Sequence, residues 1–230
     1  MKVHKLHSWQ VSPAEALDLQ RWLAGRVSRI GEVSVPRFIA GVDMALEGDG
    51  MAIGSVVILS YPQLKLVEIE VVRGKLEFPY IPGLLSFRES PLILAACESL
   101  TIFPDLLLVD GQGVAHPRRF GLASHLGLLL DIPTIGCAKS LLYGHTQEPG
   151  FESGSHCEIV DNCEIIGVTL RTKLGVKPVY VSTGHKVDLM TVIPWVLKCC
   201  RGYRLPEPLR LAHLAAGGKL RLEKKTVAMR

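Results

Sequence analysis

Apolar and polar positions follow two different periods along this chain. After Ser12, apolar residues recur at helical spacing, which predicts a helix from Pro13 to about Val27. Three runs rich in Val and Ile follow, and the turns between them contain Gly-Asp-Gly and Tyr-Pro-Gln. Such short connections predict an antiparallel meander of strands. The strands are expected at residues 37–45, 51–60 and 64–73.

The second half of the chain has alternating helical and strand-like patterns. Helices are expected at about 86–100, 119–130, 188–200 and 208–216, and strands at 105–110, 134–136 and in the runs EIIGVTLRT and PVYVS. A meander followed by this alternation predicts an α/β fold, with a mixed central sheet flanked by helices. No repeat or linker interrupts the pattern. We therefore expect a single domain over residues 1–230, with a basic, flexible tail from about residue 219.

Composition narrows the class of protein. Hydrophobic residues make up 48% of the 230 positions, which supports a sizeable core and argues against disorder. The net charge of +4 is compatible with a polyanionic partner without requiring one. No signal-peptide pattern or membrane-spanning apolar run is present, so a cytoplasmic protein without membrane association is expected. The six cysteines form no C-x-x-C pair and are expected to be free thiols, including Cys157 and Cys163 beside His156.

Three acidic residues stand out against their surroundings. Asp43 interrupts the apolar strand FIAGVDMAL, where an uncompensated carboxylate is costly. Alternation places it on the same face as Gly41, whose missing side chain is expected to leave room beside the carboxylate. Asp110 ends the apolar run LLLV, and Glu89 lies in the first turn of the next predicted helix. Converging carboxylates repel one another, and Mg²⁺ or Mn²⁺ relieves that repulsion. Taken alone, Asp110 also fits a turn and Glu89 an ordinary first-turn glutamate.

Flexible and positively charged residues follow Asp110 directly. Two glycines allow close backbone approach to a ligand, and basic side chains suit phosphate. A plain glycine turn with exposed basic residues is the alternative. The residues concerned are Gly111, Gly113, His116, Arg118, Arg119 and, after a later strand, Lys139.

The segment PYIPG places Tyr80 between two prolines. Proline stiffens a loop, and a rigid exposed aromatic can enter a base stack. On the sequence pattern alone, a packed loop aromatic is the more common interpretation. His185 and His213 are isolated histidines, to which spacing assigns no role.

Together, these segments resemble the endonuclease V family. The resemblance rests on AGVDMA, FPYIPGLLSFRE, LLLVDGQGVAHPRRFGLASHLG, PTIGCAKS and PEPLRLAHL, and extends from about Ala40 to Leu214. It implies a ribonuclease H-like fold and a Mg²⁺-dependent endonuclease of DNA repair, in which Mn²⁺ substitutes. The implied substrate is DNA containing deoxyinosine or another deaminated base. Cleavage is expected at the second phosphodiester 3′ of the lesion, leaving 3′-hydroxyl and 5′-phosphate ends.

The resemblance also implies roles for individual residues. Asp43, Asp110 and Glu89 are expected to bind the metal, and Lys139 and His213 to assist at the scissile phosphate. A strand-separating wedge is expected at Pro79, Tyr80, Ile81 and Pro82. The pocket for the displaced base is expected to include Gly83, Leu85, Gly111, Gly113, His116, Gly121 and Leu122.

Other functions remain open at this point. The family likeness leaves inosine-containing RNA as a possible substrate, although the compact chain resembles the bacterial DNA-repair forms. A nuclease for branched DNA on the same fold would respond to junction shape instead of inosine. A non-catalytic nucleic-acid-binding module would not need all three acidic residues, and a glycine-loop nucleotide-binding domain explains neither Asp43 nor PYIPG. A monomer is expected.

Overall fold

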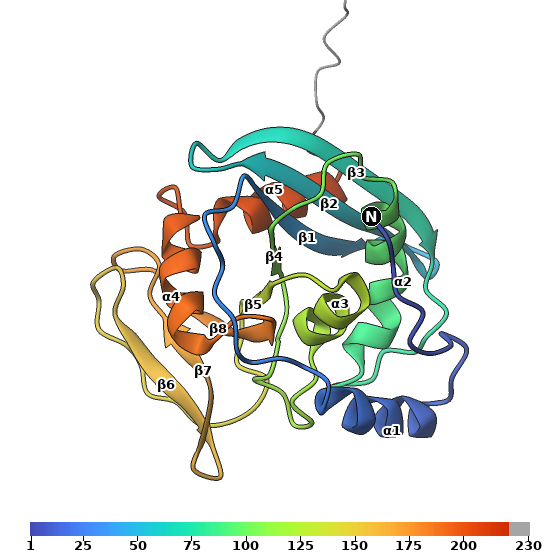
Figure 1. The fold of residues 1–230 in the computed structure, drawn as a ribbon, viewed down its shortest axis with the longest axis horizontal. Coiled ribbons are helices and arrows are strands. Elements are labelled where there is room, and N and C mark those ends of the chain that lie inside the picture. Colours follow the sequence, from blue (N-terminus) through green and yellow to red (C-terminus); the bar gives the residue numbers. More distant parts are fainter. Residues whose placement is uncertain (221–230) are drawn as a thin grey trace, which may run out of the picture.

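The computed structural model describes residues 1–220 and contains one mixed sheet with helices on both faces (Figure 1). The predicted tail lies mostly at residues 221–230, outside the described part. The strands are β1 (Phe38–Leu46), β2 (Met51–Ser60), β3 (Lys65–Lys75), β4 (Leu106–Val109), β5 (Thr134–Ala138), β6 (His156–Asp161), β7 (Glu164–Leu170) and β8 (Val179–His185). The helices are α1 (Pro13–Ala24), α2 (Leu85–Glu98), α3 (Leu122–Leu130), α4 (Leu189–Lys198) and α5 (Glu207–Ala216).

The sheet has the order β3-β2-β1-β4-β5-β8-β7-β6. The first three strands form the predicted antiparallel meander, and β4 and β5 continue from β1 as parallel strands. The last three strands return to antiparallel pairing. The predicted mixed sheet is therefore confirmed.

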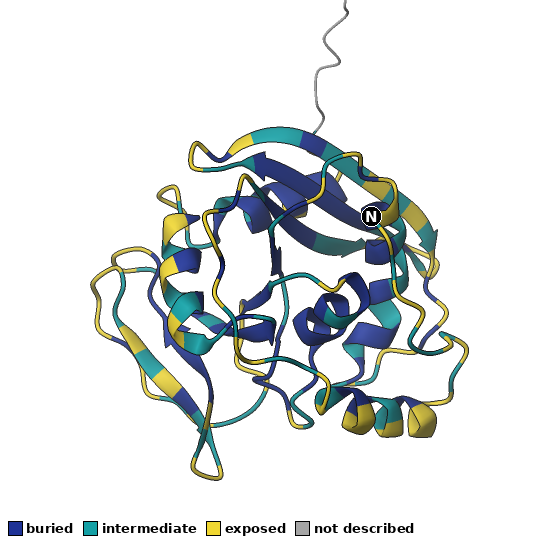
Figure 2. Cartoon of the chain, in the orientation of Figure 1, coloured by how far each residue is buried: buried dark blue, intermediate teal, exposed yellow. Residues whose placement is uncertain are grey.

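Alternation along the central strands divides the core into two layers. Ile39, Leu106 and Leu108 pack in the cluster that includes α4 and α5, whereas their neighbours Ala40 and Leu107 pack with α2 and α3. Figure 2 shows that the central strands are largely buried, whereas α1 and the β6–β7 hairpin carry many exposed positions. Within the described residues no helix is long and apolar enough to cross a membrane.

Local sequence sets several element boundaries. Ser12 caps α1 and forms a capping box with Glu15. Helix α3 begins at Leu122 and not at the expected Arg119, which has a positive φ of 55°. Strand β6 was not predicted from the sequence, because it lies at the sheet edge, buries only Ile159 and has no apolar alternation. All six cysteines are free, as expected.

Gly41 allows α5 to pack directly on β1. The sequence analysis expected its missing side chain to leave room beside Asp43. Instead, that space is occupied by the backbone of Pro208, which a Cβ at position 41 would strike. Ser55 of β2 also donates a hydrogen bond to the Ala212 carbonyl, at 2.9 Å. These contacts fix α5 against the strand that carries Asp43.

Gly41→Ala is expected to displace α5 and to lower the free energy of unfolding by about 1–3 kcal/mol, the usual cost of overpacking. Guanidinium unfolding would measure the loss. Gly48→Ala is the matched control, because a Cβ there meets no atom within 4 Å. Equal stability of the two variants would contradict the packing role of Gly41.

Candidate active site

Asp43 and Asp110 lie next to each other on neighbouring parallel strands. The register pairs Gly41 with Leu108 and Val42 with Val109, so one further step brings the two aspartates side by side. Neighbouring strands are about 4.8 Å apart, and residues in such a pair share one face of the sheet. The side chains of Asp43 and Asp110 are only 11% and 9% exposed. The sheet thus holds two carboxylates together with little water around them.

Two basic side chains compensate these carboxylates. Lys139 lies just beyond the end of β5, and its ammonium group contacts Asp110 Oδ2. His213, from α5, has its Nδ1 at 2.7 Å from Asp43 Oδ2. The backbone amide of Met44 donates to Asp43 Oδ1 at 2.8 Å. The structure therefore brings four of the five expected catalytic residues into direct pairwise contact.

The fifth residue, Glu89, is coupled to the aspartates by charge. It lies on α2, and burial together with the negative charges of Asp43 and Asp110 raises its pKa to about 8. Burial and the Asp43 charge also raise the pKa of Asp110, although Lys139 opposes this. Burial works against the charge of Lys139, but Asp110 and Asp43 shift its pKa upward. The three acids therefore form one electrostatic unit.

A divalent cation fits the chemistry of this acid cluster (Asp43, Asp110 and Glu89). Carboxylate oxygens are the ligands that Mg²⁺ and Mn²⁺ prefer, and a cation would relieve the repulsion seen in the raised pKa of Glu89. In the arrangement of residues 1–220, no three His, Cys, Asp or Glu side chains are grouped closely enough to hold an ion. Lys139 and His213 contact the aspartates, so a cation would compete with both of them.

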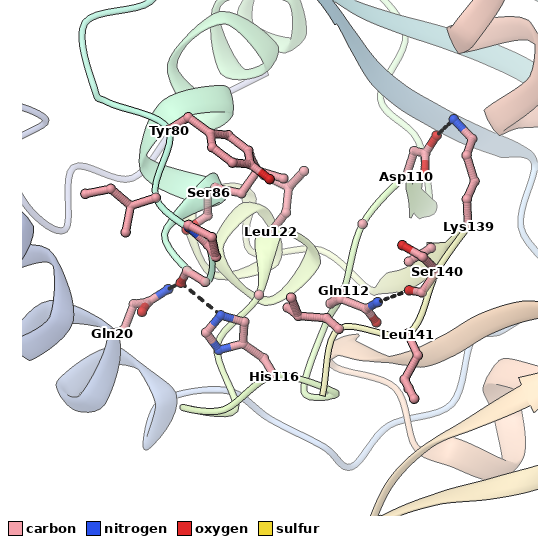
Figure 3. A pocket seen from close by; sticks show the side chains of 18 residues that line it. Gln20, Tyr80, Ser86, Asp110, Gln112, His116, Leu122, Lys139, Ser140 and Leu141 are labelled. Carbon is pink, nitrogen blue, oxygen red and sulfur yellow. Dashed lines mark hydrogen bonds and ion pairs between the residues drawn. The ribbon is translucent and has the colours of Figure 1, made fainter. Parts of the chain in front are cut away.

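A cavity of about 350 Å³ opens beside Asp110 (Figure 3). Tyr80 stands at its rim with 71% of its surface exposed. The walls include most of the residues that the sequence analysis assigned to the wedge and the pocket. These are Tyr80, Ile81, Pro82, Gly83, Leu85, Gly111, His116, Gly121 and Leu122.

Two expected residues do not line this cavity. Pro79 lies outside the lining, as does Gly113, whose amide donates to Ser182 Oγ at 2.9 Å. A Cβ on Gly113 would strike the Thr183 carbonyl of β8. This glycine therefore permits close packing between a loop and a strand and does not approach a ligand in the cavity.

The sequence analysis also missed part of the cavity wall. Ser140, Leu141 and Leu142 follow Lys139 directly, and their position next to that residue was a usable signal. Gln20 gave no signal, because it lies on a helix more than 60 residues before the loop it touches. The missed lining residues are Gln20, Ser86, Gln112, Ala138, Ser140, Leu141 and Leu142.

His116 lies in the cavity wall, is neutral, and has a hydrogen-bond partner at each ring nitrogen. Burial and the nearby Arg118 charge lower its pKa to about 4. Its Nδ1 accepts from the Arg118 amide at 3.1 Å, so Nε2 carries the proton and donates to the Gly83 carbonyl at 2.9 Å. Arg119 is engaged elsewhere, in ion pairs with Asp161 and Glu164. The Arg118 guanidinium donates to the Gly83 carbonyl at 2.8 Å, so both arginines are bound within the protein.

Comparisons with known proteins show the family of the chain. A family model described as endonuclease V matches residues 21–214. The chain belongs to the endonuclease V family. An endonuclease V of Dehalococcoides mccartyi is 52% identical over 217 residues, which cover 94% of this chain and 97% of the relative.

Solved endonuclease V structures share the fold. That of Streptomyces avermitilis superposes with a TM-score of 0.87 at 39% identity, covering 95% of this chain and 97% of its own. An endonuclease V of Ciona intestinalis, in complex with a 24mer DNA containing an inosine followed by a ribo-adenosine, gives a TM-score of 0.77 at 30% identity. That match covers 90% of this chain and 96% of the Ciona chain. The expected ribonuclease H-like fold and the nuclease class are confirmed.

Glu89→Gln is expected to change how stability depends on pH in the presence of a chelator. The folded protein raises the pKa of Glu89 from 4.5 to about 8, so its favourable protonated form is lost as pH rises through that window. The variant, which cannot ionise, should match the wild type below about pH 4.5 and exceed its unfolding free energy by a few kcal/mol, in order of magnitude, above pH 8.

Urea unfolding across this pH range would measure the difference. Glu98→Gln, at an exposed position on the same helix, is the control and should show no such trend. A stability difference that is independent of pH would contradict the coupling of Glu89 to the two aspartates.

Proposed function

We propose that this nuclease cleaves DNA strands containing deaminated bases, chiefly deoxyinosine, in a metal-dependent reaction. The cut is at the second phosphodiester 3′ of the lesion and leaves 3′-hydroxyl and 5′-phosphate ends. The observation that carries the proposal is the position of the acid cluster next to a cavity with an exposed tyrosine at its rim. A damaged base can enter the cavity while the neighbouring backbone reaches the acids.

Asp43 and Asp110 would hold Mg²⁺, or Mn²⁺ in its place, with Glu89 completing the acidic set. When bound, the ion supplies activation of water and neutralisation of phosphate charge. The Lys139 ammonium, beside Asp110, stabilises negative charge that develops on the phosphate. His213 uses Nδ1 to contact Asp43, and its side chain is 60% exposed, so Nε2 is available to exchange a proton with water.

Recognition would be the task of the cavity and its rim. Tyr80, held by Pro79, Ile81 and Pro82, would separate the strands, and the base would turn into the cavity. Hypoxanthine lacks the exocyclic amine of adenine and guanine, so a close-fitting wall can distinguish it by its edge. The inosine-containing DNA bound by the Ciona protein supports this assignment.

A role in cytoplasmic DNA repair and a monomeric state complete the proposal. The Ciona ligand contains a ribo-adenosine after its inosine, which gives a reason to test RNA as well. Matched inosine-containing DNA and RNA oligonucleotides, with the cut position mapped in Mg²⁺ and Mn²⁺, would test substrate and metal together. Cleavage that follows junction shape and ignores inosine would refute the proposal.

Asp43→Asn and Asp110→Asn are each expected to abolish cleavage, by about a thousandfold or more, because each removes a charged ligand from the acid cluster. Binding of an inosine-containing strand should remain within a few-fold of wild type. Single-turnover cleavage and fluorescence anisotropy would measure the two properties separately. Wild-type cleavage by either variant in Mg²⁺ would disprove the metal assignment.

Tyr80→Ala is expected to lower the preference for inosine-containing over undamaged strands by about tenfold, since stacking on a base contributes about 1–3 kcal/mol. Metal dependence of the remaining cleavage should not change. Phe103→Ala, which removes an exposed aromatic from another loop, is the control. An altered metal requirement with unchanged discrimination would show that Tyr80 is not the wedge.

A further inference from the structure

The carbonyl of Gly83 is held by three side chains from two other parts of the chain. Gln20 Nε2 donates to it at 2.9 Å, His116 Nε2 at 2.9 Å and Arg118 Nη2 at 2.8 Å. Gly83 ends the PYIPG segment and has a positive φ of 79°. A carbonyl oxygen has two lone pairs, so three donors on one acceptor make this an unusually strongly fixed position.

The Gln20 side chain forms hydrogen bonds with Gly83, Phe120 and Arg118, and these bonds form one network. Its Nε2 also donates to the Phe120 carbonyl at 3.1 Å, and its Oε1 accepts from Arg118 Nε at 2.5 Å. The residue is only 1% exposed, although it lies on the otherwise largely exposed helix α1. One amide group therefore ties α1 to the loop before α2 and to the loop before α3. Figure 3 shows Gln20 and His116 pointing toward the same stretch of backbone at the cavity wall.

Apolar contacts join the same elements. Ala16 of α1 is buried with Phe78, Leu84 and Phe87, which surround the PYIPG segment, and Ile81 packs against this cluster. Tyr80 itself remains exposed. The segment is thus anchored on the α1 side of its backbone, and its aromatic side chain projects from that anchor at the cavity rim.

We propose that Gln20 is a positioning residue for recognition of the damaged base, acting through the Gly83 carbonyl. It holds the segment 79–83 so that the cavity wall and the exposed Tyr80 have one fixed arrangement before the strand arrives. The inference rests on the proposed function and extends it to Gln20 on α1, which directly precedes the family match at residues 21–214.

The effect should appear in substrate binding and not in the chemical step. The acid cluster is carried by β1, the end of β4 and α2, and none of its members contacts Gln20. Removing the Gln20 amide leaves the Phe120 carbonyl and Arg118 Nε without these partners and releases one of the three bonds to Gly83. The loop must then be ordered when the strand binds, which weakens binding.

Gln20→Leu and Gln20→Glu form an informative pair. Leucine removes every hydrogen bond of the side chain at similar size, whereas glutamate keeps an acceptor for Arg118 and loses the donor to Gly83. Both variants are expected to raise KM for an inosine-containing strand about tenfold and to lower discrimination against an undamaged strand similarly. The value of kcat at saturation should stay within about twofold of wild type.

Hydrogen exchange supplies a measurement that does not need activity. In Gln20→Leu, the amide of Leu84, which donates to the Ile81 carbonyl at 2.9 Å, should exchange faster, whereas the amides of β1 and β4 should be unchanged. Asp18→Asn is the control on α1, since its side chain is 76% exposed and it pairs with the exposed Arg21. It should match the wild type in all measurements.

Two results would overturn the inference. Wild-type KM and discrimination in both Gln20 variants would show that the network has no part in recognition. An equal fall in kcat on all strands, with lowered thermal stability and faster exchange throughout the sheet, would show a merely structural role. A wild-type enzyme without preference for inosine would instead refute the proposed function, because that outcome does not depend on Gln20.

Discussion

Repulsion between neighbouring carboxylates is the constraint that shapes this protein. The parallel pairing of β1 with β4 brings Asp43 and Asp110 together at a place with little water, where two negative charges are costly. Lys139 and His213 each contact one of them, and burial together with the charges of both aspartates raises the pKa of Glu89. Folding alone does not require two buried carboxylates side by side.

Other features of the structure follow from that constraint. His213 reaches Asp43 because α5 lies directly on β1, and α5 can lie there because residue 41 is glycine. Lys139 reaches Asp110 because β5 runs parallel to β4 and ends beside it. The two carboxylates and Lys139 therefore come from neighbouring strands of the sheet, and His213 comes from the helix packed on it.

The residues that could be predicted from the sequence are those that break a local pattern of hydrophobic positions. An aspartate inside an apolar strand is conspicuous because burial penalises it, and period-2 alternation placed Asp43 and Gly41 on one face correctly. The pattern could not show that Pro208 fills the space beside Gly41, since that contact joins residues 167 positions apart. Edge strand β6 was not predicted, because most of its residues are polar or partly exposed. Its pairing with β7, and not its own hydrophobicity, makes it a strand.

Polar networks were harder to predict, for a related reason. Arg118 and Arg119 are adjacent and both basic, so the sequence treats them alike, yet one bonds to Gln20 and Gly83 and the other pairs with Asp161 and Glu164. Gly111 and Gly113 are separated by one residue and look alike in the sequence, but of the two only Gly111 lines the cavity. Partner choice in such cases depends on which distant segment packs nearby, and a single sequence does not encode that visibly.

Continuous backbone joins the acid cluster to the cavity. Asp110 ends β4, and the chain passes at once through Gly111 and Gln112 in the cavity wall. Lys139 is followed in the same way by Ser140. Asp110 and Lys139 line the cavity themselves, and the chain continues from each of them along its wall. The spacing between the acid cluster and the rest of the cavity is therefore set by covalent geometry and sheet spacing. On the proposed function, a base held in the cavity would present a nearby phosphodiester, and not its own, to the acid cluster. A constant offset between lesion and cut would then need no separate measuring element.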